Sequence, residues 1–309
     1  MYIMIVNPVA GNGKAETLFR KIQSDPLYKK ANCRSFFTEG EGHAEKLARQ
    51  VAEIHKETMI AVIVIGGDGT LHEVVNGMAN YPKIPVSFIP AGSGNDFARG
   101  VRLKDRGIKL FHKYIKRPRQ FSVRLSKYTT NHRSKKGQRI FLNSIGFGLD
   151  GEVVATANQQ KNRYWARKLH LAKLAYSFAL LRTIKRAKPI KFKLILDGKP
   201  YPVQEAMMVT ITNHPFYGGG MKIAPKANIK TPTFYVLLVE PIKKKKLLAM
   251  FFSVFLGQHI RMNEVRQMKA SCVEIQATKQ IPFQVDGQSG KCYECKIEKA
   301  EISTTFYVD

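Results

Sequence analysis

A glycine-rich turn with a single carboxylate is the part of the sequence best suited to chemistry. It consists of Gly66, Gly67, Asp68, Gly69 and Thr70. Turns of this kind bind phosphate when they lie at the start of a helix, because their backbone N–H groups are free and the helix dipole favours negative charge. A carboxylate cannot itself hold a phosphate group. Asp68 is therefore expected to bind a metal ion, to accept a proton or to have a structural partner.

The residues on either side of this turn predict a strand and a helix. Residues 59–65 are apolar throughout and rich in β-branched side chains, as in a strand buried on both faces. Residues 71–78 carry apolar side chains at helical spacing. Thr70 and Glu73 have the spacing of a capping box, in which Thr70 caps the N–H of Glu73 and Glu73 reaches back. The capping box is a sufficient structural reason for both residues, and a phosphate contact of Thr70 stays open.

The same order of strand, glycine turn and helix occurs four times in the first part of the chain. The expected strands are residues 2–6, 34–37, 59–65 and 86–89, and a turn that contains glycine follows each of them. This order predicts a parallel sheet with right-handed crossovers. Ligands of such sheets bind at the carboxyl ends of the strands, so one nucleotide site can use several of these turns.

The rest of the chain has a different texture, with short strand-like runs and little helix between them. This pattern favours a mostly antiparallel sheet or sandwich. The runs are residues 121–125, 139–144, 191–196, 206–212, 234–239, 272–277, 282–285 and 293–308. We therefore expect a nucleotide-binding α/β domain over residues 1–121 and a β-sandwich domain over residues 122–309. Helical insertions are expected near residues 164–185 and 243–256, and the sequence leaves open whether residues 296–309 return to the first domain.

The chain of 309 residues is strongly basic, with a formal net charge of +28. Residues 1–101 have 11 Lys and Arg against 10 Asp and Glu, so nearly all of the excess lies in the rest of the chain. A basic field of this size suits nucleic acid or an anionic membrane surface. No nucleic-acid recognition motif accompanies the charge, so nucleic acid is the weaker of these two partners and is not expected.

The sequence contains no sign of a membrane span, a signal peptide or a zinc site. No apolar run reaches the ~20 residues that a bilayer requires. The N-terminus reads as a first strand and lacks a basic start. The four cysteines have neither a second close-spaced pair nor nearby histidines, which favours reduced thiols. We therefore expect a cytoplasmic protein.

Two common nucleotide-binding motifs are excluded. Gly11–Lys14 resembles part of a Walker A loop, but Pro8 replaces its first glycine, and Ala15 stands where Ser or Thr must hold Mg²⁺. No GxGxxG sequence follows the first strand, so a dinucleotide-binding fold is disfavoured.

Taken together, the motifs resemble those of the diacylglycerol kinase and sphingosine kinase superfamily of lipid kinases, in its bacterial stand-alone form. Gly66–Thr70 alone is shared with NAD kinases and phosphofructokinase-like enzymes, whereas the whole set is specific. The matching segments occur in order over essentially the full chain, at residues 7–11, 38–44, 66–77, 90–98, 141–150, 213–225 and 285–287.

The resemblance implies a two-domain kinase whose phosphofructokinase-like α/β domain binds ATP, with Mg²⁺ bridging the phosphates. The γ-phosphoryl group would pass to a hydroxyl of its lipid substrate, a membrane lipid that is either diacylglycerol or a long-chain sphingoid-like base. Because a lipid kinase must reach this substrate at the bilayer, the expected partner is an anionic membrane surface, with which the protein would associate peripherally. Asp150 would face this acceptor. Asp68 would be an acid on the metal side, through the ATP-bound Mg²⁺, or on the base side. The implied nucleotide site contains Asn7, Thr38, Gly66, Gly67, Asp68, Gly69, Thr70, Gly92, Ser93 and Asn95.

Three departures from the family pattern bear on activity. Gln288 stands where bacterial members have a Glu that is proposed as the general base, and Gln cannot accept a proton at neutral pH. Thr231 and Pro232 replace an Asp-Gly pair that helps to bind a structural Mg²⁺, so that ion is expected to be absent. Ser122 stands where an Asp of an acidic network is common. If the chain is active, the base would be Asp68.

These departures leave a second hypothesis open, a catalytically weak or inactive, nucleotide-gated lipid-binding protein of the same fold. An NAD kinase is a further alternative, but it would leave the basic second part unexplained. The lysines at 243–246 and the apolar residues 247–256 predict either a helix on a membrane surface or a helix packed on the sheet with solvated lysines. The acceptor lipid and the oligomeric state are open from the sequence.

Overall fold

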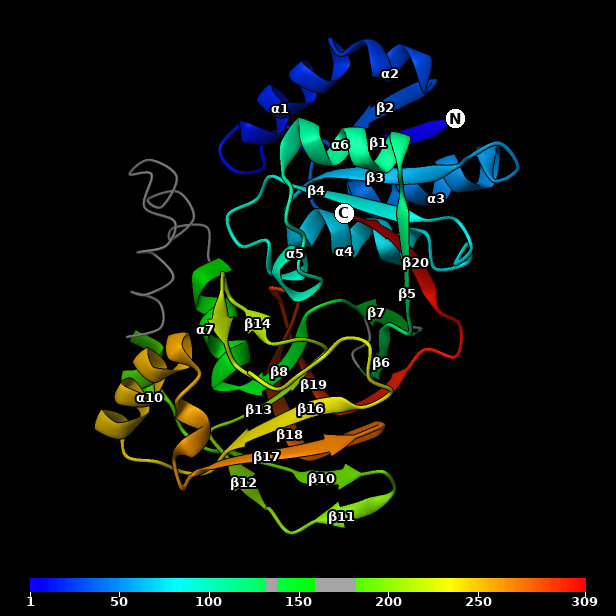
Figure 1. Cartoon of the computed structure of the whole chain (residues 1–309). Coiled ribbons are helices and arrows are strands. Elements are labelled where there is room, and N and C mark those ends of the chain that lie inside the picture. The colour runs from blue at the N-terminus through cyan, green and yellow to red at the C-terminus, as the bar shows by residue number, and fades with distance from the viewer. Residues whose placement is uncertain (132–137, 159–181) are drawn as a thin grey trace. The chain divides into compact units, whose positions relative to one another are not determined.

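The computed structural model describes residues 1–131, 138–158 and 182–309 of the chain (Figure 1). They form two compact units: unit 1 is Met1–Leu125 together with Ala300–Asp309, and unit 2 is Ser126–Lys299. The sequence places the boundary after residue 121 and leaves the place of the last strand open. That strand, β20 (Thr304–Val308), pairs with β4 (Val86–Pro90) and β5 (Arg119–Val123) and so belongs to unit 1.

Unit 1 contains a six-stranded sheet in the order β2-β1-β3-β4-β20-β5 (Figure 1). All neighbouring strands are parallel except β20 and β5, so the predicted α/β class is confirmed. Strands β1 (Tyr2–Val6) and β3 (Ala61–Gly66) are buried along their whole length, which explains why their sequences are apolar at every position. Strand β2 spans Cys33–Phe37.

Helices pack on this sheet and connect its strands. They are α1 (Lys14–Gln23), α2 (Pro26–Lys30), α3 (His43–His55), α4 (Asp68–Gly77), α5 (Asp96–Gly100) and α6 (Gly107–Lys116). Helix α6 occupies residues for which the sequence predicts neither a strand nor a helix. It forms because Leu110, Phe111 and Tyr114 are buried on one side in the same core cluster as α1, while its lysines lie outside that cluster.

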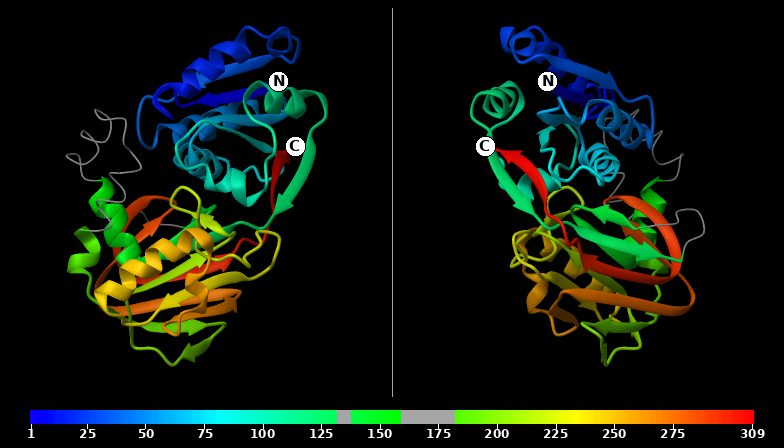
Figure 2. Two further views of the ribbon diagram at one scale, coloured as in Figure 1. Left: turned by 60° about the vertical axis from the view of Figure 1, so that its left-hand side comes forward. Right: turned by 90° about the vertical axis from the view of Figure 1, so that its right-hand side faces the viewer.

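Unit 2 contains a ten-stranded antiparallel sheet, which confirms the predicted class (Figures 1 and 2). Its main path runs β17-β16-β13-β8-β18-β19-β6-β7, and β10 and β11 are added at β18. Two further pairs are β9 (Ile190–Lys191) with β12 (Glu205–Ala206) and β14 (Phe216–Tyr217) with β15 (Met221–Lys222). The strands of the large sheet are β6 (Ser126–Thr130), β7 (Arg139–Phe141), β8 (Ser144–Gly148), β10 (Lys193–Leu196), β11 (Lys199–Tyr201), β13 (Met208–Thr212), β16 (Phe234–Val239), β17 (Val265–Ala270), β18 (Cys272–Val285) and β19 (Gln288–Lys299).

The helices of unit 2 include α7 (Leu149–Asn158), α10 (Lys244–Leu256) and the 3₁₀ helix η1 (His259–Arg261). Helix α10 confirms the helix predicted near residues 243–256. Helix α7 follows β8 directly and is not foreseen from the sequence. The helix predicted near residues 164–185 falls mostly outside the described residues.

Across residues 1–131, 138–158 and 182–309, we find no helix with the length and apolar character that a bilayer crossing requires.

The predicted capping box of α4 does not form. The helix has Gly67 as its N-cap, so Thr70 lies inside the first turn and cannot cap the N–H of Glu73. The Glu73 carboxylate instead accepts hydrogen bonds from the N–H groups of Gly42 (2.9 Å) and Ala44 (3.1 Å). These N–H groups lie at the N-terminus of α3. The N-cap residue of α3 is Gly42, which has no side chain that could accept hydrogen bonds from them. The spacing was therefore a wrong guide, because the helix begins before Thr70.

Close packing of α3 against α4 predicts the effect of one glycine substitution. A Cβ atom on Gly77 would lie 2.5 Å from the carbonyl oxygen of Glu45 and 2.7 Å from the Cβ of Ala48, both on α3. Because the two helices would have to move apart, Gly77→Ala is expected to lower the free energy of unfolding by about 1–3 kcal/mol. Urea unfolding of the full chain, followed by circular dichroism, measures the change.

Gly40→Ala is the matched control for this substitution. A Cβ atom on Gly40 would meet nothing within 4 Å, so the change is expected to stay within about 0.5 kcal/mol. Equal free energies of unfolding for the two variants would contradict the close approach of the helices.

Candidate functional site

In unit 1, the turns after β1, β3 and β4 lie against one another at the carboxyl edge of the sheet. The Asn7 side chain donates a hydrogen bond from Nδ2 to Oγ1 of Thr70 at 2.9 Å. A Cβ atom on Gly11 would lie 2.1 Å from a carbonyl oxygen of the turn after β4, and one on Gly92 would lie 2.5 Å from Cα of Gly67. Gly11 and Gly92 thus allow close contact between the turns.

The N-terminus of α4 offers hydrogen-bond donors to a ligand. No side chain caps this end of the helix, and the first N–H groups of any helix have no partner within the helix. At Gly69, a Cβ atom would meet nothing within 4 Å, so the space beside the first turn is open. Together with the helix dipole, this arrangement fits a phosphate group.

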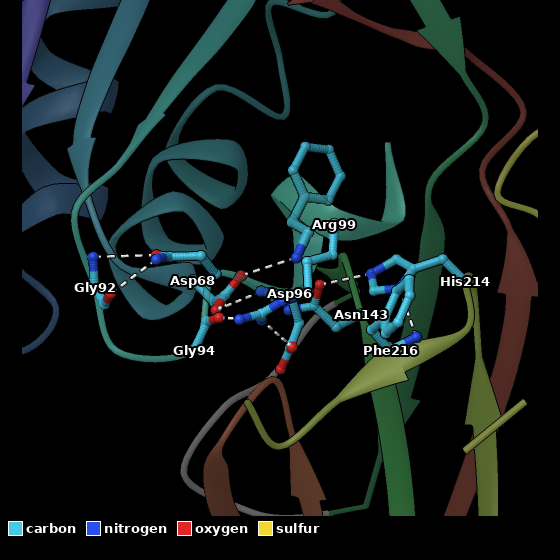
Figure 3. Close-up of polar contacts among 10 residues, drawn as sticks. Asp68, Gly92, Gly94, Asp96, Arg99, Asn143, His214 and Phe216 are labelled. Atoms are coloured by element: carbon cyan, nitrogen blue, oxygen red, sulfur yellow. Dashed lines mark hydrogen bonds and ion pairs between the residues drawn. The ribbon is translucent and has the colours of Figure 1, made fainter. Parts of the chain in front are cut away.

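Asp68 has the structural partner that its sequence context allows (Figure 3). Its Oδ2 accepts a hydrogen bond from the N–H of Asp96 at 3.0 Å, and its Oδ1 accepts one from the N–H of Phe97 at 3.0 Å. These N–H groups begin α5. The carboxylate therefore fastens the start of α5 to the Gly66–Thr70 turn.

The Gly92–Asn95 turn is closed by its own side chain (Figure 3). Asn95 accepts a hydrogen bond from the N–H of Gly92 at 3.0 Å and donates one to the carbonyl oxygen of Gly92 at 2.7 Å. Arg99 holds the other side of the turn, through the carbonyl oxygen of Gly94 and through Asp96 at 2.9 Å. The turn that faces the uncapped α4 N-terminus is thus preformed.

The remaining predicted nucleotide-site residues lie at two places in unit 1. Ser93 is exposed within the Gly92–Asn95 turn. Thr38 is buried at the end of β2, where its N–H donates to the carbonyl oxygen of Val6 at 2.9 Å. The structure therefore brings Asn7, Gly66–Thr70 and the Gly92–Asn95 turn together and places Thr38 beside the end of β1.

Asp150 is a buried carboxylate in the first turn of α7, within unit 2. Its Oδ2 accepts hydrogen bonds from Oγ1 of Thr210 at 3.3 Å and from Nε2 of Gln284 at 3.2 Å. A Cβ atom on Gly146 would lie 1.7 Å from this oxygen, so glycine leaves the space that the carboxylate fills. Burial raises the pKa of Asp150 to about 6, and the two hydrogen bonds oppose this rise. The side chain is therefore mainly ionised at neutral pH.

Asp150 lies at a small apolar cavity of unit 2, with a volume of about 30 Å³. The combination of an apolar wall and one carboxylate suits an aliphatic chain that carries a hydroxyl group, but the cavity would have to widen to admit one. The other lining residues come from α7, α10 and the segments next to them: Leu149, Val153, Ile184, Met208, Tyr217, Ile223, Leu247, Met250, Phe251 and Val254.

The partners of Asp150 are not foreseen from the sequence. Thr210 and Gln284 each lie between two apolar residues of their strand, and both are buried. A polar residue at such a position needs a hydrogen-bond partner, which is the signal that points to them. The cavity leaves no comparable signal, because its lining residues are ordinary core residues spread over more than 100 positions.

A second polar cluster of unit 2 is structural (Figure 3). The N–H of Phe216 donates to Nδ1 of His214 at 3.3 Å, so the imidazole proton is on Nε2, which donates to Oδ1 of Asn143 at 2.8 Å. Burial lowers the pKa of His214 to about 4 and keeps it neutral. Asp286 accepts hydrogen bonds from the N–H groups of residues 142–144. These motif residues hold the segment between β7 and β8.

The three residues that depart from the family pattern lie in separate surroundings. Gln288 begins β19, directly after the Asp286–Gly287 turn. Ser122 lies on β5, with Oγ 3.2 Å from Oγ1 of Thr305. The hydroxyl of Thr231 donates to a carbonyl oxygen of its own turn at 2.8 Å. Within the described residues, no group of three or more His, Cys, Asp and Glu side chains is placed to bind a metal ion.

Comparison with known proteins supports the class that the fold indicates. The diacylglycerol kinase catalytic domain model matches residues 1–124, and the YegS C-terminal NAD kinase beta sandwich-like domain model matches residues 143–294. A solved structure titled "A putative diacylglycerol kinase from Bacillus anthracis str. Sterne" superposes with a TM-score of 0.75 at 23% identity. The superposition covers 100% of this chain and 97% of that one, and it supports the fold.

Two curated relatives cover nearly the whole chain. The protein of Bacillus subtilis named "Putative lipid kinase YtlR" is 36% identical over 290 residues, which are 93% of each chain. The diacylglycerol kinase of Staphylococcus carnosus is 26% identical over 293 residues, 93% of this chain and 88% of that protein. The chain therefore belongs to the diacylglycerol kinase family of lipid kinases.

The two N–H groups bound by Asp68 predict a loss of stability in Asp68→Asn. An amide has only one acceptor oxygen, so its NH₂ group would face the N–H of Asp96 or Phe97. We expect the free energy of unfolding to fall by about 1–3 kcal/mol. Glu57→Gln, which removes the same charge from an exposed side chain, is the control in the same urea titration. An Asp68→Asn variant as stable as this control would rule out the anchoring role.

The raised pKa of Asp150 predicts a pH-dependent stability. The folded protein binds this proton more tightly than the unfolded chain, whose Asp pKa is 3.8. Protonation of Asp150 therefore contributes fully to the free energy of unfolding below about pH 4. It is lost as the pH rises through about 6, and the difference amounts to about 3 kcal/mol at most. Asp150→Asn cannot ionise and should therefore gain stability relative to the wild type between about pH 4 and pH 6. Urea unfolding at several pH values measures this difference, and a difference that does not change with pH would disprove the assignment.

Proposed function

We propose that the protein is an ATP- and Mg²⁺-dependent kinase that phosphorylates a hydroxyl group of a membrane lipid. The acceptor is diacylglycerol or a long-chain sphingoid-like base. The observation that carries the proposal is the uncapped N-terminus of α4 at Gly66–Thr70, with open space beside Gly69. Membership of a lipid kinase family supports the same chemistry.

The nucleotide would bind with its phosphates at this helix N-terminus. Phosphoryl transfer depends mainly on positioning and on neutralising charge, and the preformed turns of unit 1 suit that task. Asn7 fixes Thr70, and Asn95 fixes the Gly92–Asn95 turn. Mg²⁺ bound to the phosphates would neutralise their charge, and Asp68 provides a fixed negative charge in the same turn.

The acceptor lipid would bind at the cavity of unit 2, which would have to widen to admit it. Its hydroxyl would donate a hydrogen bond to Asp150, and its aliphatic part would contact the apolar wall. Thr210 and Gln284 both bind Oδ2 of Asp150 and so fix the orientation of the carboxylate. The Asp150 carboxylate is therefore held in place before the lipid binds.

Gln288 cannot act as the general base of the reaction. Two carboxylates, Asp68 and Asp150, are the candidates for that role. Asp68 is the candidate from the sequence, but both of its oxygens already accept hydrogen bonds from α5. Asp150 has a pKa of about 6, close to the pH at which a general base works best. The two acids can be distinguished by the pH dependence of the reaction.

The key experiment is incubation with ATP labelled on the γ-phosphate and a total lipid extract. A labelled lipid is the expected product, and its identity gives the acceptor class. Asp68→Asn is expected to abolish turnover, whereas Gln288→Ala should change it little. Equal loss in both variants would refute the assignment of Asp68, and no labelled lipid with the wild type would refute the kinase.

The pH profile of kcat/KM tests the role of Asp150. If Asp150 must be ionised to bind the acceptor hydroxyl, kcat/KM should fall below pH 6 with an apparent pKa near 6. Gln284→Met removes one hydrogen bond that stabilises the ionised form, so it should shift this apparent pKa upward. If Gln284→Met leaves the pH profile unshifted, ionisation of Asp150 does not cause the fall of kcat/KM at low pH.

The second candidate function is a nucleotide-gated lipid-binding protein with little or no catalysis. The observation that favours it is Gln288, which begins β19 where the family has its proposed base. It predicts ATP-dependent retention of a lipid from the same extract without transfer of label. A labelled lipid would exclude it.

A further inference from the structure

Helix α10 has two apolar sides, and one of them is exposed. Leu247, Met250 and Val254 are buried in unit 2. Phe252 and Leu256 lie on the other side and are 64% and 70% exposed, and Phe255 is 49% exposed. In Figure 1 and in the left view of Figure 2, α10 lies along the outside of unit 2. A helix that is apolar all round is normally covered on every side.

The exposed side chains of α10 form a cluster. The Phe251 ring contacts the rings of Phe252 and Phe255, with centroid separations of 5.8 Å and 5.6 Å. In the rest of the described chain, the exposed large apolar side chains occur singly along the sequence, as Ile54 and Ile302 do. Single exposed apolar residues are normal on soluble proteins, whereas a contiguous group marks an interaction surface.

The N-terminal turn of α10 concentrates positive charge where a helix disfavours it. Lys243 is the N-cap, three lysines follow, and no acid lies in the first turn. Cations at this end oppose the helix dipole. Lys244 donates to the carbonyl oxygen of Lys185, and Lys246 pairs with Glu264. Within the described residues, the side-chain amines of Lys243 and Lys245 have no ion-pair or hydrogen-bond partner, so their position points to an external anion.

Basic residues also lie beyond the other end of the helix. Arg261 is exposed on η1, and Lys222 is exposed on β15. The Cβ of Lys222 lies 3.7 Å from where a Cβ of Gly257, the C-cap of α10, would be. The apolar cluster of α10 is thus flanked by positive charge at both ends.

We propose that α10 docks unit 2 onto an anionic lipid bilayer. Phe252, Phe255 and Leu256 enter the headgroup boundary, and the flanking basic side chains contact lipid phosphates. The choice of a bilayer as the partner rests on the proposed function, while the surface itself does not. Apolar insertion combined with basic attraction is the binding mode of interfacial helices.

Charge argues against the other occupants of this surface. Unit 2 has 31 Lys and Arg against 10 Asp and Glu, so a second copy of the same surface would repel it. Nucleic acid would use the lysines but would leave Phe252 and Leu256 in water. A bilayer satisfies both sets of side chains, because Lys245, Phe252 and Leu256 follow at i, i+7 and i+11 on one face.

Cosedimentation with vesicles tests the docking without ATP or turnover. The wild type should bind vesicles of equimolar phosphatidylglycerol and phosphatidylcholine, bind pure phosphatidylcholine weakly, and dissociate as salt rises. Phe252→Ser with Leu256→Ser should weaken binding by at least about tenfold. Lys243→Gln with Lys245→Gln should weaken it by about fivefold for each lysine.

Matched controls replace exposed apolar side chains and exposed lysines outside α10. Ile54→Ser with Ile302→Ser replaces two side chains that are 74% and 66% exposed. Lys193→Gln with Lys279→Gln removes two exposed charges from strands of unit 2. Both controls should bind vesicles like the wild type or nearly so. Equal loss in the α10 variants and the controls, or no binding by the wild type, would overturn the proposal.

Tryptophan fluorescence tests the depth of insertion directly. The chain has one tryptophan, Trp165, so Trp165→Phe gives a background for Phe252→Trp and for the control Ile54→Trp. Brominated phospholipids should quench Phe252→Trp and leave Ile54→Trp bright. An unquenched signal from vesicle-bound Phe252→Trp would refute insertion of α10.

Two outcomes separate this inference from the kinase proposal and from self-association. Vesicle binding through α10 without any labelled lipid product would refute the kinase and keep the docking surface. The variant with Phe252→Ser and Leu256→Ser could instead change from an oligomer to a monomer in sedimentation velocity while its vesicle binding stays unchanged. This result would show that the surface is a contact between copies of the chain and would overturn the docking surface.

Discussion

The carboxylates of α4 cap other helices and leave the N-terminus of α4 itself uncapped. The proposed phosphate site depends on this uncapped N-terminus. Asp68 binds the first N–H groups of α5, and Glu73 binds those at the start of α3. Thr70 receives its hydrogen bond from Asn7 and does not cap α4. The acids therefore stabilise the elements around the site, while no side chain caps the first N–H groups of α4, which are left for an anion. A helix that capped itself would block that position.

Unit 2 uses glycine to admit a carboxylate into an apolar region. Gly146 leaves the space for Asp150, and a Cβ atom on Gly151 would lie 2.5 Å from the backbone nitrogen of Phe283. Helix α7 can therefore pack directly on β18, which brings Gln284 within hydrogen-bond distance of Asp150. The pattern of glycines around Asp150 thus has a packing cause, and the packing in turn sets the orientation and the raised pKa of the acid.

Local patterns were sufficient for the architecture and insufficient for the partners of the acids. The alternation of apolar runs and glycine turns predicts the parallel sheet, because β1, β3 and β4 are buried on both faces. The capping box at Thr70 and Glu73 was wrong, since sequence spacing does not show that β3 ends at Gly66 and that α3 needs a cap. The partners of Asp150 are 60 and 134 residues away in the chain, and only tertiary packing brings them together.

Helix α10 joins the two lipid-related features of unit 2. Leu247, Met250 and Val254 line the cavity that contains Asp150, and Phe252 and Leu256 on the other side are exposed. If that exposed side rests on a bilayer, one helix separates the bilayer from the cavity. Its two sides are then coupled, because a rotation that inserts Phe252 further also moves the cavity wall. Docking would thereby adjust the space open to the acceptor chain. This coupling is a physical reason for an apolar helix with lysines in its N-terminal turn to lie at this position.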